Sequence, residues 1–127
     1  MKTIKILFLF ICAVLITGCS SDNDNNTAQN NAPVLNDIIL EVSENPNSDL
    51  VTTIVATDSD EDTLTYAIIS QTPAGSVSIN AINGEVYIAN ADAFDYDLNQ
   101  QIIVTIEISD GITEVTAQLT INITQDS

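Results

Sequence analysis

Apolar and polar residues alternate along the C-terminal part of this 127-residue chain, and this alternation limits the fold more than any other feature. A period of two places the apolar side chains on one face of a β-strand. Between two such stretches, Asp110-Gly111 is typical of a tight hairpin turn. The sequence therefore predicts two antiparallel strands with a shared buried face, formed by Ile102, Val104, Ile106, Ile108, Val115, Ala117, Leu119, Ile121 and Ile123.

Shorter stretches rich in β-branched residues precede this hairpin and are separated by turn residues such as Asn83-Gly84. Together they predict seven strands at residues 37–42, 50–56, 64–70, 76–79, 85–88, 101–109 and 114–123. Seven short strands in about 95 residues indicate one all-β domain over residues 33–127, a seven-stranded Greek-key β-sandwich of the immunoglobulin-like class. Tyr66, Tyr87 and Phe94 are expected in or beside its core, whereas Tyr96 is expected to be exposed.

The N-terminal residues differ in character from the rest of the chain. Lys2 and Lys5 precede an apolar run at residues 6–16, a pattern typical of a secretory signal peptide and too short to span a membrane. Residues 15–19 resemble a bacterial lipobox, which implies a signal peptide at 1–18 and lipidation of Cys19. The alternative is an ordinary cleaved signal in which Cys19 has no role.

Residues 20–32 contain no apolar periodicity and are rich in Asn and Asp, which predicts a flexible tether after the lipidated cysteine. The acidic stretch at 20–24 resembles the surface-export signals of Bacteroidota lipoproteins. It implies an outer-membrane lipoprotein of the bacterial cell envelope that is exposed at the cell surface. A plain low-complexity tether is the alternative.

The charge balance restricts the partners of the chain. All 18 acidic residues lie after Cys19, whereas the two basic residues lie before it, and the sequence has no His. Nucleic acid and anionic membrane surfaces would repel such a chain, so metal cations or a basic partner are the expected counter-charges. Without His or a Cys in the mature chain, the usual nucleophile–base pairs of enzymes cannot form, and we expect no enzymatic activity.

Acidic residues gather most densely at residues 58–62, where Asp58, Asp60, Glu61 and Asp62 lie between two predicted strands. Asp58, Asp60 and Asp62 match the first three ligand positions of an EF-hand loop, which also needs Gly at its sixth position and Glu at its twelfth. Those positions hold Thr63 and Ile69, so the EF-hand is excluded. Residues 95–99 fail the same test.

The order of several motifs resembles that of a cadherin repeat over about 90 residues. The matching stretches are SENP at 43–46, ATDSD at 56–60 followed by Tyr66, INAINGEV at 79–86 (with Asn83 in place of the usual Thr), FDYD at 94–97 and IEISDG at 106–111. The preceding NNAP at 30–33 is similar to the linker before such a repeat. The resemblance implies a cadherin-like sandwich that binds Ca²⁺ at its two ends.

By the pattern of that family, Asp58, Asp60 and Asp110 would bind calcium at one end, near Asn30 and Asn31. A second set, Glu44, Asp95 and Asp97, would lie at the opposite end. Complete sites in that family are shared between consecutive repeats, so each end of one repeat is expected to be a weak half-site, with a dissociation constant of about 10⁻⁴–10⁻³ M. Glu61 and Asp62 are expected to face water. The alternative for each cluster is a solvated acidic loop.

The resemblance implies a lipid-anchored adhesion or protein-interaction module whose partner is a protein, a glycan or another cadherin-like domain. Two alternatives belong to other classes: a carbohydrate-binding lipoprotein of a surface uptake system, and a structural spacer. A sugar site usually needs an exposed aromatic platform, for which this chain offers only Tyr87 or Tyr96.

Overall fold

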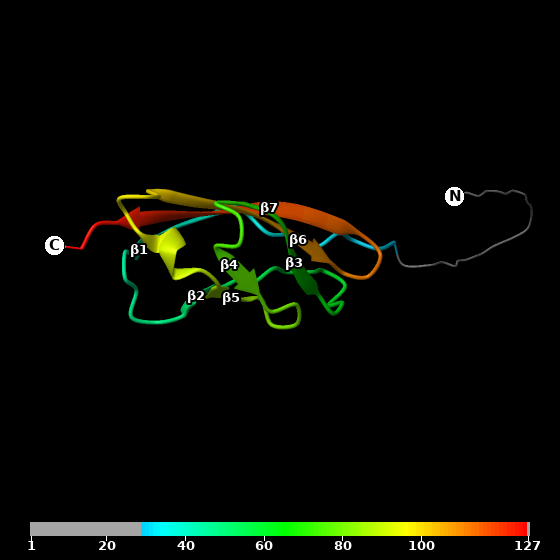
Figure 1. The fold of residues 1–127 in the computed structure, drawn as a ribbon. Coiled ribbons are helices and arrows are strands. Elements are labelled where there is room, and N and C mark those ends of the chain that lie inside the picture. The colour runs from blue at the N-terminus through cyan, green and yellow to red at the C-terminus, as the bar shows by residue number, and fades with distance from the viewer. Residues whose placement is uncertain (1–28, 127) are drawn as a thin grey trace, which may run out of the picture.

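The computed structural model describes residues 29–126, which form a sandwich of two β-sheets (Figure 1). The predicted signal peptide, Cys19 and most of the predicted tether lie outside the described residues. Within the described part, no helix has the length and apolar character needed to cross a membrane. The described chain enters at one end of the sandwich and leaves at the opposite end (Figure 1).

Seven strands form the two layers, as the sequence predicts. The larger sheet has the order β1-β7-β6-β3, with β1 at Ile38–Ser43, β7 at Glu114–Thr124, β6 at Gln101–Ser109 and β3 at Thr65–Thr72. The smaller sheet has the order β2-β5-β4, with β2 at Leu50–Thr53, β5 at Glu85–Ile88 and β4 at Val77–Ile79. A short 3₁₀ helix, η2, spans Ala91–Phe94. β1 pairs with β7 in parallel, whereas the other strand pairs are antiparallel.

The core lies between the sheets and uses the alternating positions of the C-terminal hairpin. In β6, Ile102, Val104, Ile106 and Ile108 are buried and Ile103 is exposed, whereas the apolar residues of β7 are buried except for the half-buried Val115. Tyr66 and Phe94 are also buried, which confirms both predictions, while Tyr87 is half-buried. Tyr96 was expected in solvent, but it is half-buried and packs against the core.

β2 ends at Thr53 rather than at residue 56, because the following residues find partners elsewhere. The N–H of Ile54 donates to the carbonyl of Gly84 at 2.8 Å, and Thr57 forms an isolated antiparallel bridge with Val34. Gly84 has a φ of +75°, and a Cβ atom there would lie 2.4 Å from the Ile54 carbonyl oxygen. Both the left-handed backbone and this close approach require glycine at the predicted Asn83-Gly84 turn.

Candidate metal centre

Three carboxylates from two loops meet at the end of the sandwich where the described chain begins. Asp58 and Asp62 lie in the loop between β2 and β3, and Asp110 lies at the start of the β6–β7 turn. One oxygen from each lies within 4.8 Å of the others. Asp110 is 8% exposed, Asp58 is half-buried and Asp62 is exposed. We call residues 30–31, 58–62 and 110–113 the proximal pole.

The loop at residues 58–62 wraps around the side chain of Asp58. Its Oδ1 accepts the backbone N–H of Asp60 at 2.8 Å and that of Asp62 at 3.4 Å. Glu61 adopts a φ of +61°, which turns the chain back so that its N–H donates to the Asp58 carbonyl at 3.0 Å. The other carboxylate oxygen, Oδ2, is buried and has no hydrogen-bond partner among the described residues. A buried carboxylate oxygen without a partner is costly, and a cation would satisfy it.

Asp110 is held by hydrogen bonds to its own turn and to the N-terminal segment. Its Oδ1 accepts the N–H groups of Thr113 at 2.7 Å and Ile112 at 2.8 Å, and its Oδ2 accepts Nδ2 of Asn30 at 3.0 Å. The N–H of Thr113, the Asn30 side chain and the N–H of Ile112 lower the pKa of Asp110, in that order. These hydrogen bonds therefore favour the charged form of the Asp110 carboxylate.

The pKa of Asp62 is shifted in the opposite direction from that of Asp110. Partial desolvation of its carboxyl group, followed by the negative charges of Asp58, Asp60 and Asp110, raises the pKa of Asp62. Like charges at this distance disfavour ionisation, and a bound cation would reverse the effect. The proximal pole therefore contains charge that is not compensated within the described residues.

Asp60, which the cadherin pattern places among the ligands, is not part of this three-carboxylate group. Instead, its Oδ2 accepts the backbone N–H of Asn31 at 2.7 Å and its Oδ1 accepts Nδ2 of Asn31 at 3.1 Å. Glu61 and Asp62 are both exposed, as expected, but the Asp62 carboxylate also belongs to the group. The spacing of Asp58, Asp60 and Asp62 at every second position marks all three as candidate ligands, but no local pattern shows which of them join Asp110.

The three grouped carboxylates fit a calcium ion. Calcium lies 2.3–2.6 Å from its oxygen ligands, so two oxygens on one ion are at most about 5 Å apart. The separations within 4.8 Å meet this limit. The unpartnered Oδ2 of Asp58 supplies one oxygen that no protein group already uses. Residues Asp58, Asp62 and Asp110 could thus hold the ion, with further ligands from backbone carbonyls, water or a second domain.

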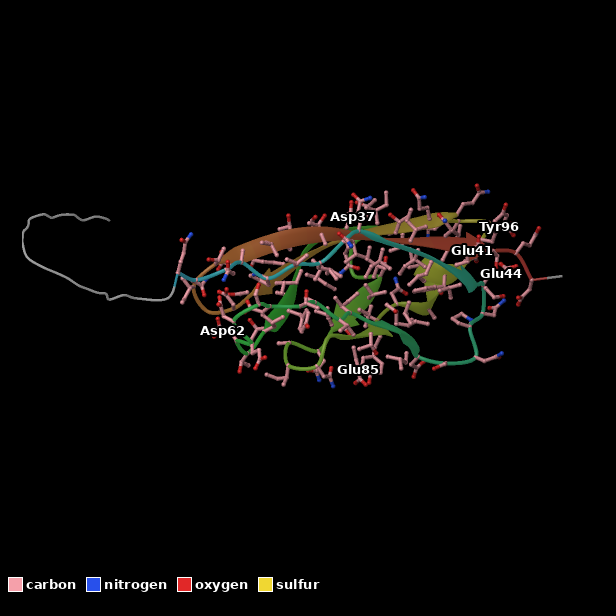
Figure 2. The ribbon with its side chains drawn as sticks, turned by 180° about the vertical axis from the view of Figure 1, so that it is seen from behind. Asp37, Glu41, Glu44, Asp62, Glu85 and Tyr96 are labelled. Atoms are coloured by element: carbon pink, nitrogen blue, oxygen red, sulfur yellow. The ribbon has the colours of Figure 1, made fainter. Side chains whose placement is uncertain are left out.

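Glu44 and Tyr96 lie at the opposite end of the sandwich from Asp62 (Figure 2). The second predicted set belongs to this end, and we call residues 43–44, 95–97 and 126 the distal pole. There, Glu44 accepts the N–H of Tyr96 at 3.2 Å and the N–H of Asp126 at 2.9 Å. Asp126 in turn accepts the hydroxyl of Ser43. Asp95 accepts the N–H of Asp97 at 2.9 Å. The structure does not bring Glu44, Asp95 and Asp97 together as a group of three close carboxylates.

The fold and its acidic end define an immunoglobulin-like β-sandwich, and comparisons with known proteins specify its family. The family model described as "Cadherin domain" matches residues 39–124. The chain therefore belongs to the cadherin domain family. Cadherin domains are non-enzymatic adhesion and protein-interaction modules that typically bind Ca²⁺. A comparison with curated proteins yields no match.

Solved structures agree with this assignment. The chain is 28% identical to human protocadherin-24 EC1-2, with a TM-score of 0.63 over 76% of this chain and 44% of that one. Mouse cadherin-23 EC22-24 matches at 19% identity and a TM-score of 0.66, over 76% of this chain and 33% of that one. Drosophila N-cadherin EC1-4 matches at 22% identity and a TM-score of 0.60, over 69% and 23%. The chain thus spans less than half of each of these structures.

Proposed function

We propose that this chain is a lipid-anchored protein of the bacterial cell envelope whose cadherin domain binds calcium at the proximal pole and acts in cell adhesion or protein interaction. The observation that carries the calcium assignment is the group formed by Asp58, Asp62 and Asp110, with its buried and unpartnered Asp58 oxygen. Membership of the cadherin domain family supports the interaction role. The lipobox-like residues 15–19 support the lipid anchor.

Each residue of the proximal pole has a distinct part in this function. Asp58, Asp62 and Asp110 hold the ion, which supplies positive charge where three carboxylates repel one another. Asn31 binds Asp60, and Asn30 binds Asp110, so the N-terminal segment is attached to the same loops. The ion and the segment that leads to the predicted anchor therefore share one structural unit, and binding of the ion would stiffen the junction between them.

The cellular location is part of the same proposal. The acidic residues 20–24 support outer-membrane location and surface exposure. The partner is a protein or glycan, with another cadherin-like domain as one form of it. A role without catalysis follows from the family and from the absence of His in the sequence.

Thermal unfolding at constant high ionic strength tests the calcium assignment. Calcium at ten times its dissociation constant adds about 1.4 kcal/mol, or about 5–10 °C in Tm for a domain of this size. Magnesium should add much less, because it requires strict octahedral geometry and loses its water reluctantly. The double variant Asp58→Asn with Asp62→Asn should lose most of the calcium gain.

The matched control is Glu61→Gln with Glu114→Gln, which removes the same charge from exposed residues outside the group. This control should keep the full calcium response. Equal effects of calcium and magnesium, together with equal responses of the two double variants, would show that the proximal pole is only a solvated acidic loop.

A further inference from the structure

The two long sides of the sandwich are closed to different degrees. On one side, the β3 residue Gln71 joins the sheets: its Nε2 donates to the Val77 carbonyl at 3.0 Å, and its Oε1 accepts the Val77 N–H at 2.9 Å. Nearby, the N–H of Tyr66 donates to the Ala81 carbonyl. These bonds link β3 to β4 and to the turn that follows β4.

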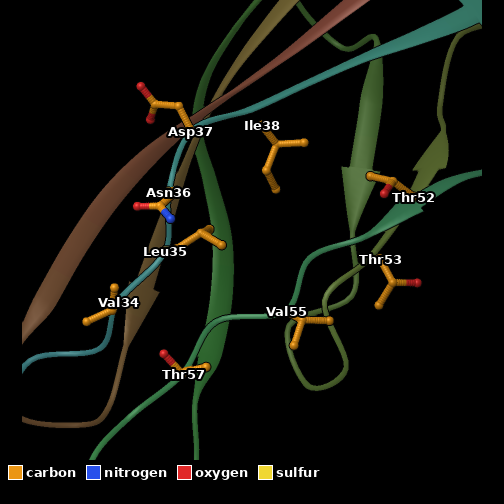
Figure 3. A pocket seen from close by; sticks show the side chains of 9 residues that line it. All are labelled: Val34, Leu35, Asn36, Asp37, Ile38, Thr52, Thr53, Val55 and Thr57. Atoms are coloured by element: carbon orange, nitrogen blue, oxygen red, sulfur yellow. The ribbon is translucent and has the colours of Figure 1, made fainter.

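The other side is open. β1 is the edge strand of the larger sheet, and β2 is the edge strand of the smaller one. Among the described residues, the bridge between Val34 and Thr57 joins the segments that lead into and out of these strands. Beyond this bridge, residues 34–38 and 52–57 diverge around a groove of about 450 Å³ (Figure 3). We call it the β1/β2 groove.

The chemistry of the β1/β2 groove suits an extended peptide. An edge strand presents unpaired N–H and C=O groups, which can pair with an added strand. The side chains around the groove are mainly aliphatic or threonine, types that pack well in sheets. Val34 and Val55 are 58% and 72% exposed, so apolar surface is available along the groove. Because the N–H and C=O of Thr57 are already bonded to Val34, an added strand can pair within residues 52–56, which span about 17 Å and match about five residues.

Charge identifies the class of occupant. The sequence has 18 acidic residues, of which Asp22 and Asp24 precede residue 29, so the described residues carry 16 and contain no Lys, Arg or His. A second copy of residues 29–126 would bring the same negative charges and no basic residue to compensate them. A positively charged segment would be attracted by the field of the whole domain.

We propose that the β1/β2 groove binds an extended, positively charged segment of another protein, which adds as a strand along residues 52–56. This inference deepens the proposed interaction function and rests on it for the existence of a partner. It does not depend on calcium, because the groove and the proximal carboxylates are formed by different residues.

Fluorescence anisotropy with the full-length chain in a neutral detergent tests the inference. The probe is a labelled eight-residue peptide in which Lys alternates with Val or Thr. We expect saturable binding, and Val55→Lys should weaken it at least fivefold by placing a cation in the groove. The matched control Ile69→Lys adds the same charge on the opposite edge strand, at a side chain that is 53% exposed, and should change affinity less than twofold.

Two further peptides and one direct measurement separate strand addition from general attraction. A peptide with Glu in place of Lys should not bind. A peptide of equal charge with two central prolines should bind at least fivefold more weakly, because proline cannot donate to the ladder. Amide shifts in NMR spectra of the unmodified protein should concentrate at residues 34–38 and 52–57. This measurement decides the matter if Val55→Lys fails to fold.

Equal binding of the proline peptide, equal losses in the two Lys variants, or shifts concentrated at the acidic poles would overturn the inference. The titrations are run with calcium and with EDTA beside the melting experiment. Absence of peptide binding with intact calcium stabilisation would reject the groove alone. Peptide binding without calcium stabilisation would reject the calcium function alone.

Discussion

At the proximal pole, Asp58, Asp62 and Asp110 place oxygens within 4.8 Å of one another, and the buried Oδ2 of Asp58 has no partner among the described residues. At the distal pole, both oxygens of Glu44 accept backbone N–H groups, one from Tyr96 and one from Asp126. Both ends are rich in carboxylates. They differ in how far the backbone supplies the hydrogen bonds that these carboxylates need.

This difference shows that the number of acidic residues does not by itself make a cation site. The distal turn and the C-terminal segment bring N–H groups to Glu44, and hydrogen bonds to a carboxylate stabilise its charge without a metal. The proximal loop directs its N–H groups to Oδ1 of Asp58 and leaves Oδ2 without one. Calcium should therefore act first at the proximal pole, where protein donors are missing.

The largest expected effect separates the two poles directly. In the distal double variant Glu44→Gln with Asp97→Asn, calcium should still raise Tm by about 5–10 °C at ten times its dissociation constant, measured from the variant's own metal-free Tm. Isothermal titration of the parent protein should give one equivalent of bound calcium. Two equivalents, with one lost in the distal variant, would show that the distal half-site implied by the cadherin pattern also binds.

A somewhat smaller effect tests whether backbone donors satisfy the distal pole. Without metal, Glu44→Ala should lower the free energy of unfolding by about 1 kcal/mol, or about 4–8 °C in Tm, because two N–H groups lose a charged acceptor. The control Glu41→Ala removes an exposed carboxylate from β1, the strand that Glu44 directly follows, and should change Tm little. Equal shifts in the two variants would mean that Glu44 contributes only charge, and the contrast between the poles would fail.

Much of the fold could be predicted because local pattern and burial agree. The bounds of β5 and β6 match the sequence prediction, since their ends coincide with turn residues. β2 is shorter than predicted because Thr57 pairs with Val34, a contact between distant residues that no local pattern contains. The two aspartate neighbours of Tyr96 predicted an exposed side chain. Instead, the N–H of Tyr96 donates to Glu44, and its side chain packs against the core.

The candidate site could likewise be predicted from the sequence only in part. Asp58 and Asp110 come together because the loops that follow β2 and β6 lie at the same end of the sandwich. The cadherin resemblance includes both residues. The exchange of Asp60 for Asp62 could not be predicted, because it depends on two hydrogen bonds from Asn31 that hold Asp60 aside. Their roles as metal ligands stay predictions until an ion is measured.

The smallest expected effect concerns the repulsion at the proximal pole, and its sign follows from the raised pKa of Asp62. The folded protein binds this proton more tightly than the unfolded chain does. Stability is therefore lost as pH rises from the usual Asp pKa of 3.8 through the raised pKa of the folded state. Asp110 acts in the opposite sense: its pKa is lowered, so its contribution is present above the usual pKa and lost as pH falls.

Without calcium at neutral pH, Asp62→Asn should therefore raise Tm by about 1–3 °C, as expected for relief of screened charges near a surface. The gain should vanish below about pH 4, where the Asp62 carboxyl of the parent is protonated, and it should shrink in high salt because ions screen the repulsion. With saturating calcium the sign should reverse, since the variant lacks a ligand. Melting curves over pH and salt measure this, with Asp97→Asn at the distal pole as the matched control. A Tm gain that persists in acid, or an equal Tm gain in the control, would show that the neighbouring carboxylates do not destabilise the ionised Asp62.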